Sequence, residues 1–322
     1  MKRFPILAVI IAAALIAAVV LFLERVEQRP DGSGARRGFG KETLKKASTR
    51  KPPRPGLEPA LPGTAYRGRS VAIIIDDIGF DLRIVEKLSE IPAPIAFAVL
   101  PYTPHAVEAA KLFHAAGKEI LLHLPMEPHA YPGGSPGAGA LMADMDAGEI
   151  RRQLREDLAA VPFVSGVNNH MGSRFMEDEA RLAIVMEELR VKDLFFVDSR
   201  TTADSRGRES AGRARVRFAA RDVFIDDAPG YAAALENLTG ALRQGQRNGA
   251  PVLMIGHPHM ETVRAILDVL PFWQKEGVKV IPVSACLRIS GGAGKQGPFV
   301  INRQNDESAS ERKTLNEPDI AP

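Results

Sequence analysis

Aspartates and histidines recur where short apolar runs of this sequence end. In "VAIIIDDIGF" the run at residues 71–75 leads directly into Asp76 and Asp77, and "EILL" leads into His123. Three further runs end alike, with His170 and Arg174 in "NNHMGSRF", Asp198 in "FFVDSR" and His257 in "GHPH". Imidazoles and carboxylates bind zinc-type metal ions and carry protons in general acid–base catalysis. If these ends meet in space, they can form a catalytic metal site.

The apolar runs alternate with segments of helical periodicity, and this alternation predicts how the ends are brought together. Strand, helix, strand at intervals of 20–30 residues is typical of parallel strands joined by crossover helices. Such folds place their sites at the carboxyl ends of the strands, and seven or eight units favour a barrel over an open sheet. The expected strands are residues 71–75, 95–100, 119–123, 165–169, 194–198, 222–226, 251–256 and 278–283, and the expected helices are 81–91, 104–116, 146–160, 178–190, 230–248 and 261–276.

Two histidines and one aspartate would leave a divalent metal with open positions for water and substrate. The second aspartate can then act as base, and a histidine at a strand end as acid. Several of these residues also have a plain structural explanation. Asp198 is equally suited to capping the next helix, and Asn168 and Asn169 are more typical of loop hydrogen bonding. Asp226, in an acidic pair with Asp227, is interpreted as a turn residue or a substrate contact.

The chain begins with a candidate membrane anchor. Residues 4–23 carry no charge. A helix of this length is about long enough to span a ~30 Å hydrocarbon core. The bulky residues at the end of this run favour an uncleaved anchor over a cleaved signal peptide. Lys2 and Arg3 favour an internal N-terminus, whereas Arg25 and Arg29 favour the reverse, so charge alone leaves the orientation open.

Charge is unevenly distributed along the 322 residues. Residues 24–70 hold 12 Lys/Arg and 5 Asp/Glu, a net charge of +7, and are predicted to be a flexible linker. Residues 71–287 hold 23 Lys/Arg and 29 Asp/Glu, a net charge of −6, which argues against a nucleic-acid partner. The single cysteine, Cys286, rules out an intrachain disulfide. Residues 288–322 are polar and are expected to be disordered.

Five motifs in order, "IIIDDIG", "LLHLPMEP", "NNHMGSRF", "FFVDSRT" and "MIGHP", resemble the divergent polysaccharide deacetylase family. The resemblance covers about residues 71–287. It implies a single catalytic domain with a distorted (β/α)7-type barrel, placed behind the anchor and linker. It also implies a divalent metal, with zinc first, and the removal of N- or O-acetyl groups from carbohydrates.

The resemblance assigns roles residue by residue. Asp76 would be the base and Asp77 a metal ligand, and Arg174 would orient the base. His257, tuned by Asp198, would be the general acid. The wider superfamily has two histidine ligands four residues apart; His123 matches the first, but Glu127 stands at the second place. His170 is therefore the preferred third ligand, with Glu127 the alternative and His129 a weaker one. Asn169 and Arg200 are the candidates for substrate contact.

The expected protein is an inner-membrane-anchored hydrolase whose domain faces the periplasm, where acetylated glycan or peptidoglycan is the partner. The alternative is a catalytically inactive glycan-binding or envelope-organising protein that retains the metal site. A phosphatase of the strand-end aspartate type ranks last, because its aspartates are usually separated by one residue.

Overall fold

The computed structural model describes residues 69–244 and 250–289. The predicted anchor at residues 1–23, nearly all of the predicted linker and residues 290–322 lie outside the described residues. Within the described ranges, no helix combines the length and apolarity needed to cross a membrane.

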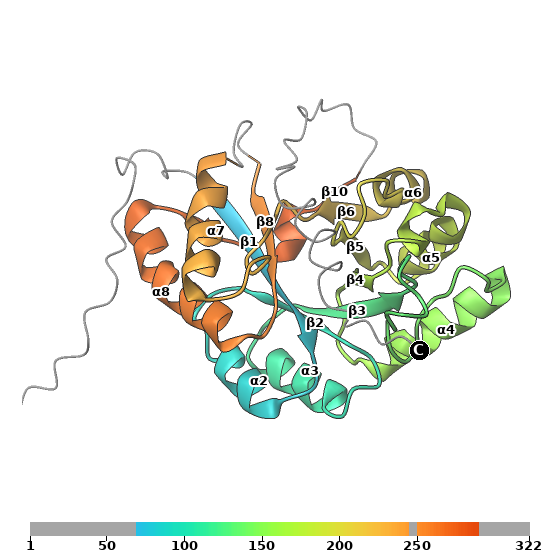
Figure 1. Cartoon of the computed structure of the whole chain (residues 1–322), viewed down its shortest axis with the longest axis horizontal. Helices are drawn as coiled ribbons and strands as arrows, with labels where there is room; N and C mark the ends of the chain where they lie inside the picture. The colour runs from blue at the N-terminus through green and yellow to red at the C-terminus, as the bar shows by residue number, and fades with distance from the viewer. Residues whose placement is uncertain (1–68, 245–249, 290–322) are drawn as a thin grey trace, which may run out of the picture. The chain divides into compact units, whose positions relative to one another are not determined.

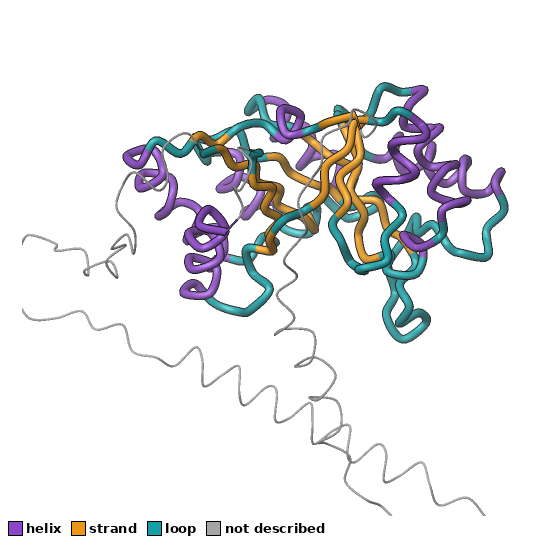
Figure 2. The backbone as a smooth tube through the Cα atoms, turned by 90° about the horizontal axis from the view of Figure 1, so that it is seen from above, coloured by secondary structure: helices purple, strands orange, loops and turns teal. Residues whose placement is uncertain are grey.

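A curled, mainly parallel sheet forms the centre of the domain (Figures 1 and 2). Its order is β10-β6-β5-β4-β3-β2-β1-β8-β7, with β9 paired to β1, and only the β10–β6 pair is antiparallel. No pairing joins β10 to β7 among the described strands, so the predicted (β/α)7 barrel is here a barrel-like sheet that is not closed by hydrogen bonds. The strands are β1 (Ser70–Ile78), β2 (Ala96–Val99), β3 (Ile120–Met126), β4 (Gly166–Met171), β5 (Phe195–Asp198), β6 (Arg217–Ala220), β7 (Val223–Phe224), β8 (Val252–Gly256), β9 (Lys279–Val280) and β10 (Arg288–Ile289).

Helices flank this sheet, and several that are neighbours in sequence pack side by side (Figure 1). They are α2 (Leu82–Ser89), α3 (Ala106–Ala115), α4 (Ala147–Ala160), α5 (Glu179–Val191), α6 (Gly207–Ala214), α7 (Tyr231–Gln244) and α8 (Met260–Glu276). Six of them fall on the predicted helical segments. Asp146 begins α4 with a capping box, in which its carboxylate accepts from the amide of Glu149 and the Glu149 side chain accepts in return.

Alternate residues of each strand belong to two separate cores. On β1, Ile73 and Ile75 pack with the helices in the outer core, whereas Ala72 and Ile74 face an inner core. The same alternation places Phe196 outside and Val197 inside on β5. Because side chains point to opposite faces with a period of two, this parity decides which strand-end residues reach the interior.

The amino-terminal end of the inner core is covered by a short 3₁₀ helix, η3 (Val283–Cys286). Val283 is fully buried in that core. Glu119, just before β3, accepts a 2.7 Å hydrogen bond from the amide of Val283 and also bonds Ser284. Side chains thereby fill the interior at this end. The candidate site residues lie at the opposite end, where the strands have their carboxyl ends.

One α-helix and two strands lie outside the predicted set. The polar, arginine-rich sequence of α6 and the short β6 lack the apolar periodicity that identified the other elements. Strand β10 pairs with β6, so regular structure continues two residues past the predicted boundary at 287.

Candidate active site

Adjacent aspartates on a regular strand would point to opposite faces, yet Asp76 and Asp77 both contribute to the interior site. Asp76 has the parity of Ala72 and Ile74 and is 2% exposed. At Asp77 the backbone adopts φ 55°, and the β1–β2 register shifts between Ile75 and Ile78. This irregularity behaves as a bulge, which re-aims one side chain relative to the pleat. It allows both carboxylates to lie near the same histidine.

Asp77, His123 and His170 come together as the sequence predicts. The Oδ1 of Asp77 lies 3.2 Å from Nε2 of His123 and 3.1 Å from Nδ1 of His170, and the two nitrogens are 3.1 Å apart. The register of β3 and β4 produces this contact, because His123 pairs with Asn168 and Pro125 pairs with His170. His123 and His170 are therefore on the same face of neighbouring strands.

The hydrogen bonds of Asn168 identify which nitrogen of His123 carries the proton. Its Nδ2 donates to Oδ1 of Asp76 at 2.8 Å and also approaches the Ser199 hydroxyl. Its Oδ1, which can only accept, lies 3.0 Å from Nδ1 of His123. His123 must therefore carry a proton on Nδ1, and when neutral it presents the lone pair of Nε2 to Asp77 and His170.

This arrangement gathers electron-rich atoms that need a cation. The Oδ1 of Asp77 is buried and has no hydrogen-bond partner among the described residues. A metal held at ~2.0–2.2 Å has neighbouring ligand atoms roughly 3.0–3.4 Å apart, from the geometry of an octahedron or tetrahedron. The observed separations of 3.1, 3.2 and 3.1 Å fall within that range. The three residues fit a divalent metal, and a set of three protein ligands would leave coordination positions for water and substrate.

His257 pairs with Asp226, not with Asp198, the partner predicted from the sequence. Its Nδ1 lies 2.9 Å from Oδ1 of Asp226, and its amide donates to Oδ2 of the same residue at 2.7 Å. Thr262 also donates to that Oδ2, at 2.8 Å. Burial opposes protonation of His257, but Asp226 outweighs it and raises the histidine pKa.

Asp198 has the parity of Phe196 and therefore faces the outer helices. Its Oδ2 accepts from the Ser205 hydroxyl at 2.7 Å, and its Oδ1 accepts from the amide of Arg200 at 2.7 Å. Burial raises the pKa of this carboxyl, although these hydrogen bonds oppose the shift. Asp198 does not cap the next helix as the structural explanation expected, because Arg206 precedes α6 and no side chain caps it. Its contacts instead order the loop that leads to α6.

Arg174 and Glu127 bind each other instead of the site. Nη1 of Arg174 lies 2.5 Å from Oε1 of Glu127, and Oε2 of Glu127 accepts from the amide of Ala143. The predicted contact of Arg174 with Asp76 is therefore replaced by an ion pair at the base of the loop after β3. Both carboxylate oxygens of Glu127, the alternative third ligand, are therefore bound to other partners. Glu127 does not belong to the group of candidate ligands.

Arg221 is a half-buried cation that interacts electrostatically with Asp76. It donates to the carbonyl of Ser199 at 2.7 Å and stacks 3.6 Å from the ring centre of Phe224. Burial lowers its pKa to about 10, while the carboxylates of Asp198, Asp227 and Asp76 act in the opposite direction. Arg221 was not predicted from the sequence, because the role of the arginine near Asp76 was assigned to Arg174 in the motif "NNHMGSRF".

The two candidate substrate contacts differ in position. Asn169 has the outward parity of Val167, is 1% exposed, and uses its side chain on the carbonyl of Met171 and the amide of Ser199. It is a structural residue of the loop rather than a substrate contact. His129 is bound to Glu177 at 3.0 Å and lies outside the ligand group. Arg200, at φ 53°, remains a prediction.

Burial and the neighbouring side chains shift the pKa values of Asp76 and Asp77. Burial raises the pKa of Asp76, and the neighbouring His123 and Asn168 oppose that rise. The pKa of Asp77 is lowered despite its burial, because His123 and His170 face its Oδ1. The two adjacent carboxyls are thus shifted in opposite directions, a pattern that separates a proton carrier from a permanently ionised ligand.

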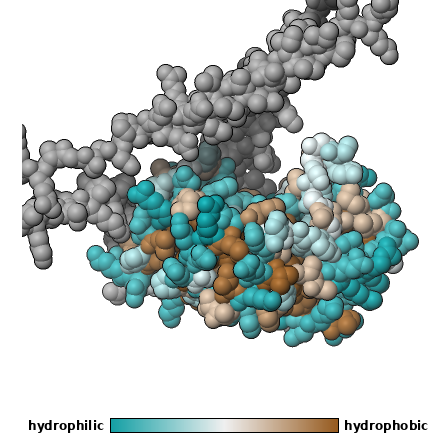
Figure 3. Space-filling view, turned by 90° about the horizontal axis from the view of Figure 1, so that it is seen from below, coloured by the Kyte–Doolittle hydropathy of each residue, from teal (hydrophilic) through white to brown (hydrophobic). Residues whose placement is uncertain are grey.

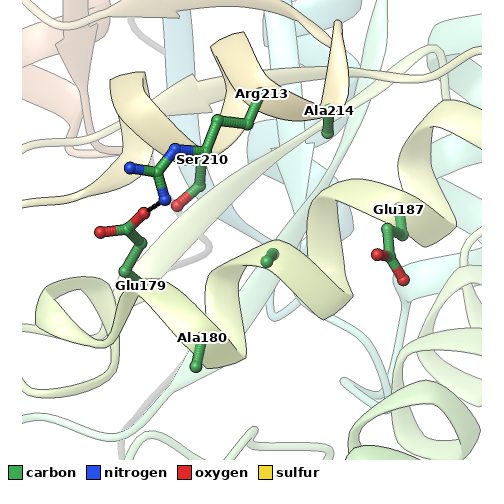
Figure 4. Close-up of a pocket in the computed structure, with 7 residues that line it drawn as sticks. Glu179, Ala180, Glu187, Ser210, Arg213 and Ala214 are labelled. Atoms are coloured by element: carbon green, nitrogen blue, oxygen red, sulfur yellow. Dashed lines mark ion pairs between the residues drawn. The ribbon is translucent and has the colours of Figure 1, made fainter.

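Two other features contrast with this site. Asp226, His257 and His259 form a second group with ligand atoms within 4.8 Å of one another, but Asp226 already accepts hydrogen bonds from three donors. A hollow on the outer surface between α5 and α6 is lined by an ion pair of Glu179 with Arg213 (Figure 4). It contains none of the strand-end residues.

Comparison with known proteins gives a consistent result. A family model described as divergent polysaccharide deacetylase matches residues 73–287. The uncharacterized protein YibQ of Escherichia coli is 35% identical over 211 residues, covering 66% of this chain and 65% of that protein, which is slightly less than two thirds of its length. An uncharacterized protein of Haemophilus influenzae is 30% identical over 202 residues, covering 63% and 71%. The crystal structure of ATU2773 from Agrobacterium tumefaciens superposes with a TM-score of 0.65 at 26% identity, covering 68% of this chain and 89% of that one.

Proposed function

Because the chain belongs to the divergent polysaccharide deacetylase family, we propose that it is a metal-dependent hydrolase that removes acetyl groups from a carbohydrate. The observation that carries this proposal is the Asp77, His123 and His170 triangle, flanked by the buried carboxyl of Asp76 and by the His257–Asp226 pair. Together these supply a metal site, a base and an acid in one interior.

Asp77, His123 and His170 would hold the metal, which when bound polarises the acetyl carbonyl and makes water more acidic. Asp76, whose pKa is raised by burial, accepts the proton of the attacking water. Nδ1 of His257 is engaged by Asp226, so Nε2 is the nitrogen left to donate a proton to the departing sugar amine or hydroxyl. Asp226 favours the protonated imidazole that this step requires.

Two exposed aromatic side chains, in the loops that follow β1 and β2, favour a sugar substrate. Phe80 and Tyr102 are 63% and 48% exposed and follow the ends of the neighbouring strands β1 and β2. Their loops are joined by a 2.9 Å hydrogen bond from the amide of His105 to the carbonyl of Gly79. Aromatic rings of this kind offer an apolar face to the C–H face of a pyranose. Figure 3 shows hydrophobic residues interspersed with polar ones on the face of the domain that it presents.

We also propose that residues 1–23 anchor the protein to the inner membrane and that the domain works in the periplasm on peptidoglycan or another acetylated glycan. This location is supported by the uncharged run at residues 4–23 and by the basic linker that follows it. Membrane fractionation of the full-length protein, with protease added outside spheroplasts, tests both the anchor and its orientation. Recovery of the full-length protein in the soluble fraction would contradict the anchor.

Acetate release is the direct test of activity. The full-length protein, loaded with zinc, is incubated with chitooligosaccharides and with peptidoglycan fragments, beside the Asp76→Ala and His170→Ala variants. We expect release by the wild type and a loss of at least 100-fold in both variants. Metal binding without acetate release from any glycan would overturn the hydrolase and favour a glycan-binding protein that retains the metal site.

A further inference from the structure

Asn168 occupies a position that connects the two halves of the proposed machinery. It is fully buried, and its amide spans the gap between His123, a proposed metal ligand, and Asp76, the proposed base. Each of its polar atoms has a partner: Oδ1 faces Nδ1 of His123 at 3.0 Å, and Nδ2 donates to Asp76 at 2.8 Å and approaches Ser199 Oγ at 3.3 Å.

We propose that Asn168 is a positioning residue that fixes the tautomer of His123 and the orientation of Asp76 at the same time. This inference rests on the metal-dependent function proposed above. The carbonyl of Asn168 requires the proton of His123 on Nδ1, which commits Nε2 to the metal. The amide N–H of Asn168 requires an acceptor oxygen on Asp76, which holds that carboxyl beside the metal site.

The strand register explains why a side chain that both accepts and donates stands here. His123 and Asn168 are paired residues of the parallel strands β3 and β4, and Asp76 lies on the same interior face on β1. The bridging residue must accept on one side and donate on the other. An amide does both, whereas a carboxylate only accepts and an aliphatic side chain does neither.

The two halves of this role can be separated by substitution. In Asn168→Asp the carboxylate still accepts from Nδ1 of His123, so the ligand nitrogen is preserved, but the donor to Asp76 is lost and a negative charge faces it. In Asn168→Leu, which is of similar size, both contacts are lost. Asn169→Leu is the matched control, because Asn169 is equally buried on the adjacent position but faces the outer loop.

Two measurements on the full-length protein test the inference. Zinc affinity is measured by competition with a chromophoric chelator, and the His123 tautomer is read in the metal-free protein from its ring ¹⁵N shifts. We expect Asn168→Leu to lose the fixed Nδ1–H tautomer and to bind zinc 10–100-fold more weakly. Asn168→Asp should keep both the tautomer and the zinc affinity within about threefold, while turnover falls.

Several results would overturn the role of Asn168. An unchanged tautomer and zinc affinity in Asn168→Leu would do so, as would an equal loss of affinity in Asn169→Leu, which would point to general destabilisation. Undiminished turnover in Asn168→Asp would refute the contact with Asp76. If no glycan releases acetate in the wild type, the hydrolase proposal fails, but the tautomer and affinity measurements still decide whether Asn168 sets the ligand nitrogen.

Discussion

The interior site depends on which face of its strand each residue occupies. Asp76, His123, Asn168 and His257 share inward parity; the first three contact one another, and Asp76 acts electrostatically on His257. Asp198 ends a strand in the same way but has outward parity, so it contacts Ser205 and the loop before α6. A residue at a strand end therefore takes part in the site only when its parity is also correct.

Substitutions of Asp226 and Asp198 are expected to differ in their effect on the pH dependence of activity. Asp226→Asn removes the carboxylate that raises the pKa of His257, so that pKa falls and the protonated acid is lost at a lower pH. We expect kcat at neutral pH to fall about 10²-fold or more, with the alkaline limb of the profile moved to lower pH. Asp198→Asn should leave that limb in place. A profile moved by Asp198→Asn and not by Asp226→Asn would restore the pairing predicted from sequence.

The sequence could identify most strand-end residues but not all of their partners. In "FFVD" every residue before Asp198 is apolar and buried, because both faces of the strand are covered, so its inward face cannot be recognised from sequence. Asp226 and His257 are 31 residues apart and meet only because β7 pairs with β8. The available signal for Asp226 was the acidic pair after "VFI", which was instead interpreted as a turn or a substrate contact.

At the level of elements, Gly79 permits the sharp exit of the chain from β1. Its φ is +129°, and an added Cβ would lie 1.9 Å from Oγ1 of Thr103. We expect Gly79→Ala to lower the free energy of unfolding by about 2–4 kcal/mol, through backbone strain and overpacking. Denaturant titration with circular dichroism measures the change.

Gly240 provides the matched control for that substitution. It lies within α7, and an added Cβ would meet no atom within 4 Å. Gly240→Ala should raise the free energy of unfolding by about 0.5–1 kcal/mol, because alanine loses less conformational entropy in a helix. Equal effects of the two substitutions would contradict the close approach at Gly79.

Asp157 on α4 makes the stability of its element dependent on pH. It is fully buried, one oxygen accepts from Gln153 at 2.9 Å, and burial raises its pKa from 3.8 to about 7. Between about pH 4 and pH 7 the folded chain therefore binds more protons than the unfolded chain. Stability falls as pH rises through this window and is constant above it, as far as this group is concerned.

Replacing Asp157 with asparagine removes the titrating group while keeping its size. We expect the variant to gain stability relative to the wild type on going from pH 5 to pH 8, by at most about 3 kcal/mol. Urea unfolding at the two pH values gives the difference. A wild-type-to-variant difference that is the same at pH 5 and pH 8 would show that Asp157 is already ionised in the folded state.

At the scale of the whole molecule, the alternation of strands and helices was predictable and the closure of the sheet was not. Eight apolar segments and six helical segments were located from periodicity, since each buries a continuous apolar face. The arginine-rich α6 and the short β6 and β10 depend on tertiary contacts, such as the stacking of Arg208 over Phe218 at 5.2 Å. Whether a parallel sheet closes depends on pairing between its edge strands, which leaves no local signal in the sequence.

Metal binding should stabilise the whole domain, because its proposed ligands come from three strands, β1, β3 and β4. A ligand present at 100 times its dissociation constant stabilises the folded state by about 2.7 kcal/mol. For a domain of this size that corresponds to a rise of about 5–10 °C in Tm. Differential scanning calorimetry with zinc and with excess chelator measures it, and Asp77→Ala should abolish the shift. An equal shift in Asp77→Ala would place the metal elsewhere.

In the proposed site, Asp77, His123 and His170 hold one divalent metal, and Glu127 is not a ligand. The most direct measurement is metal stoichiometry by elemental mass spectrometry after equilibrium dialysis against zinc, compared among the wild type, His170→Ala and Glu127→Ala. We predict one zinc per chain in the wild type and in Glu127→Ala, and almost none in His170→Ala. Full occupancy in His170→Ala together with loss in Glu127→Ala would contradict the ligand set.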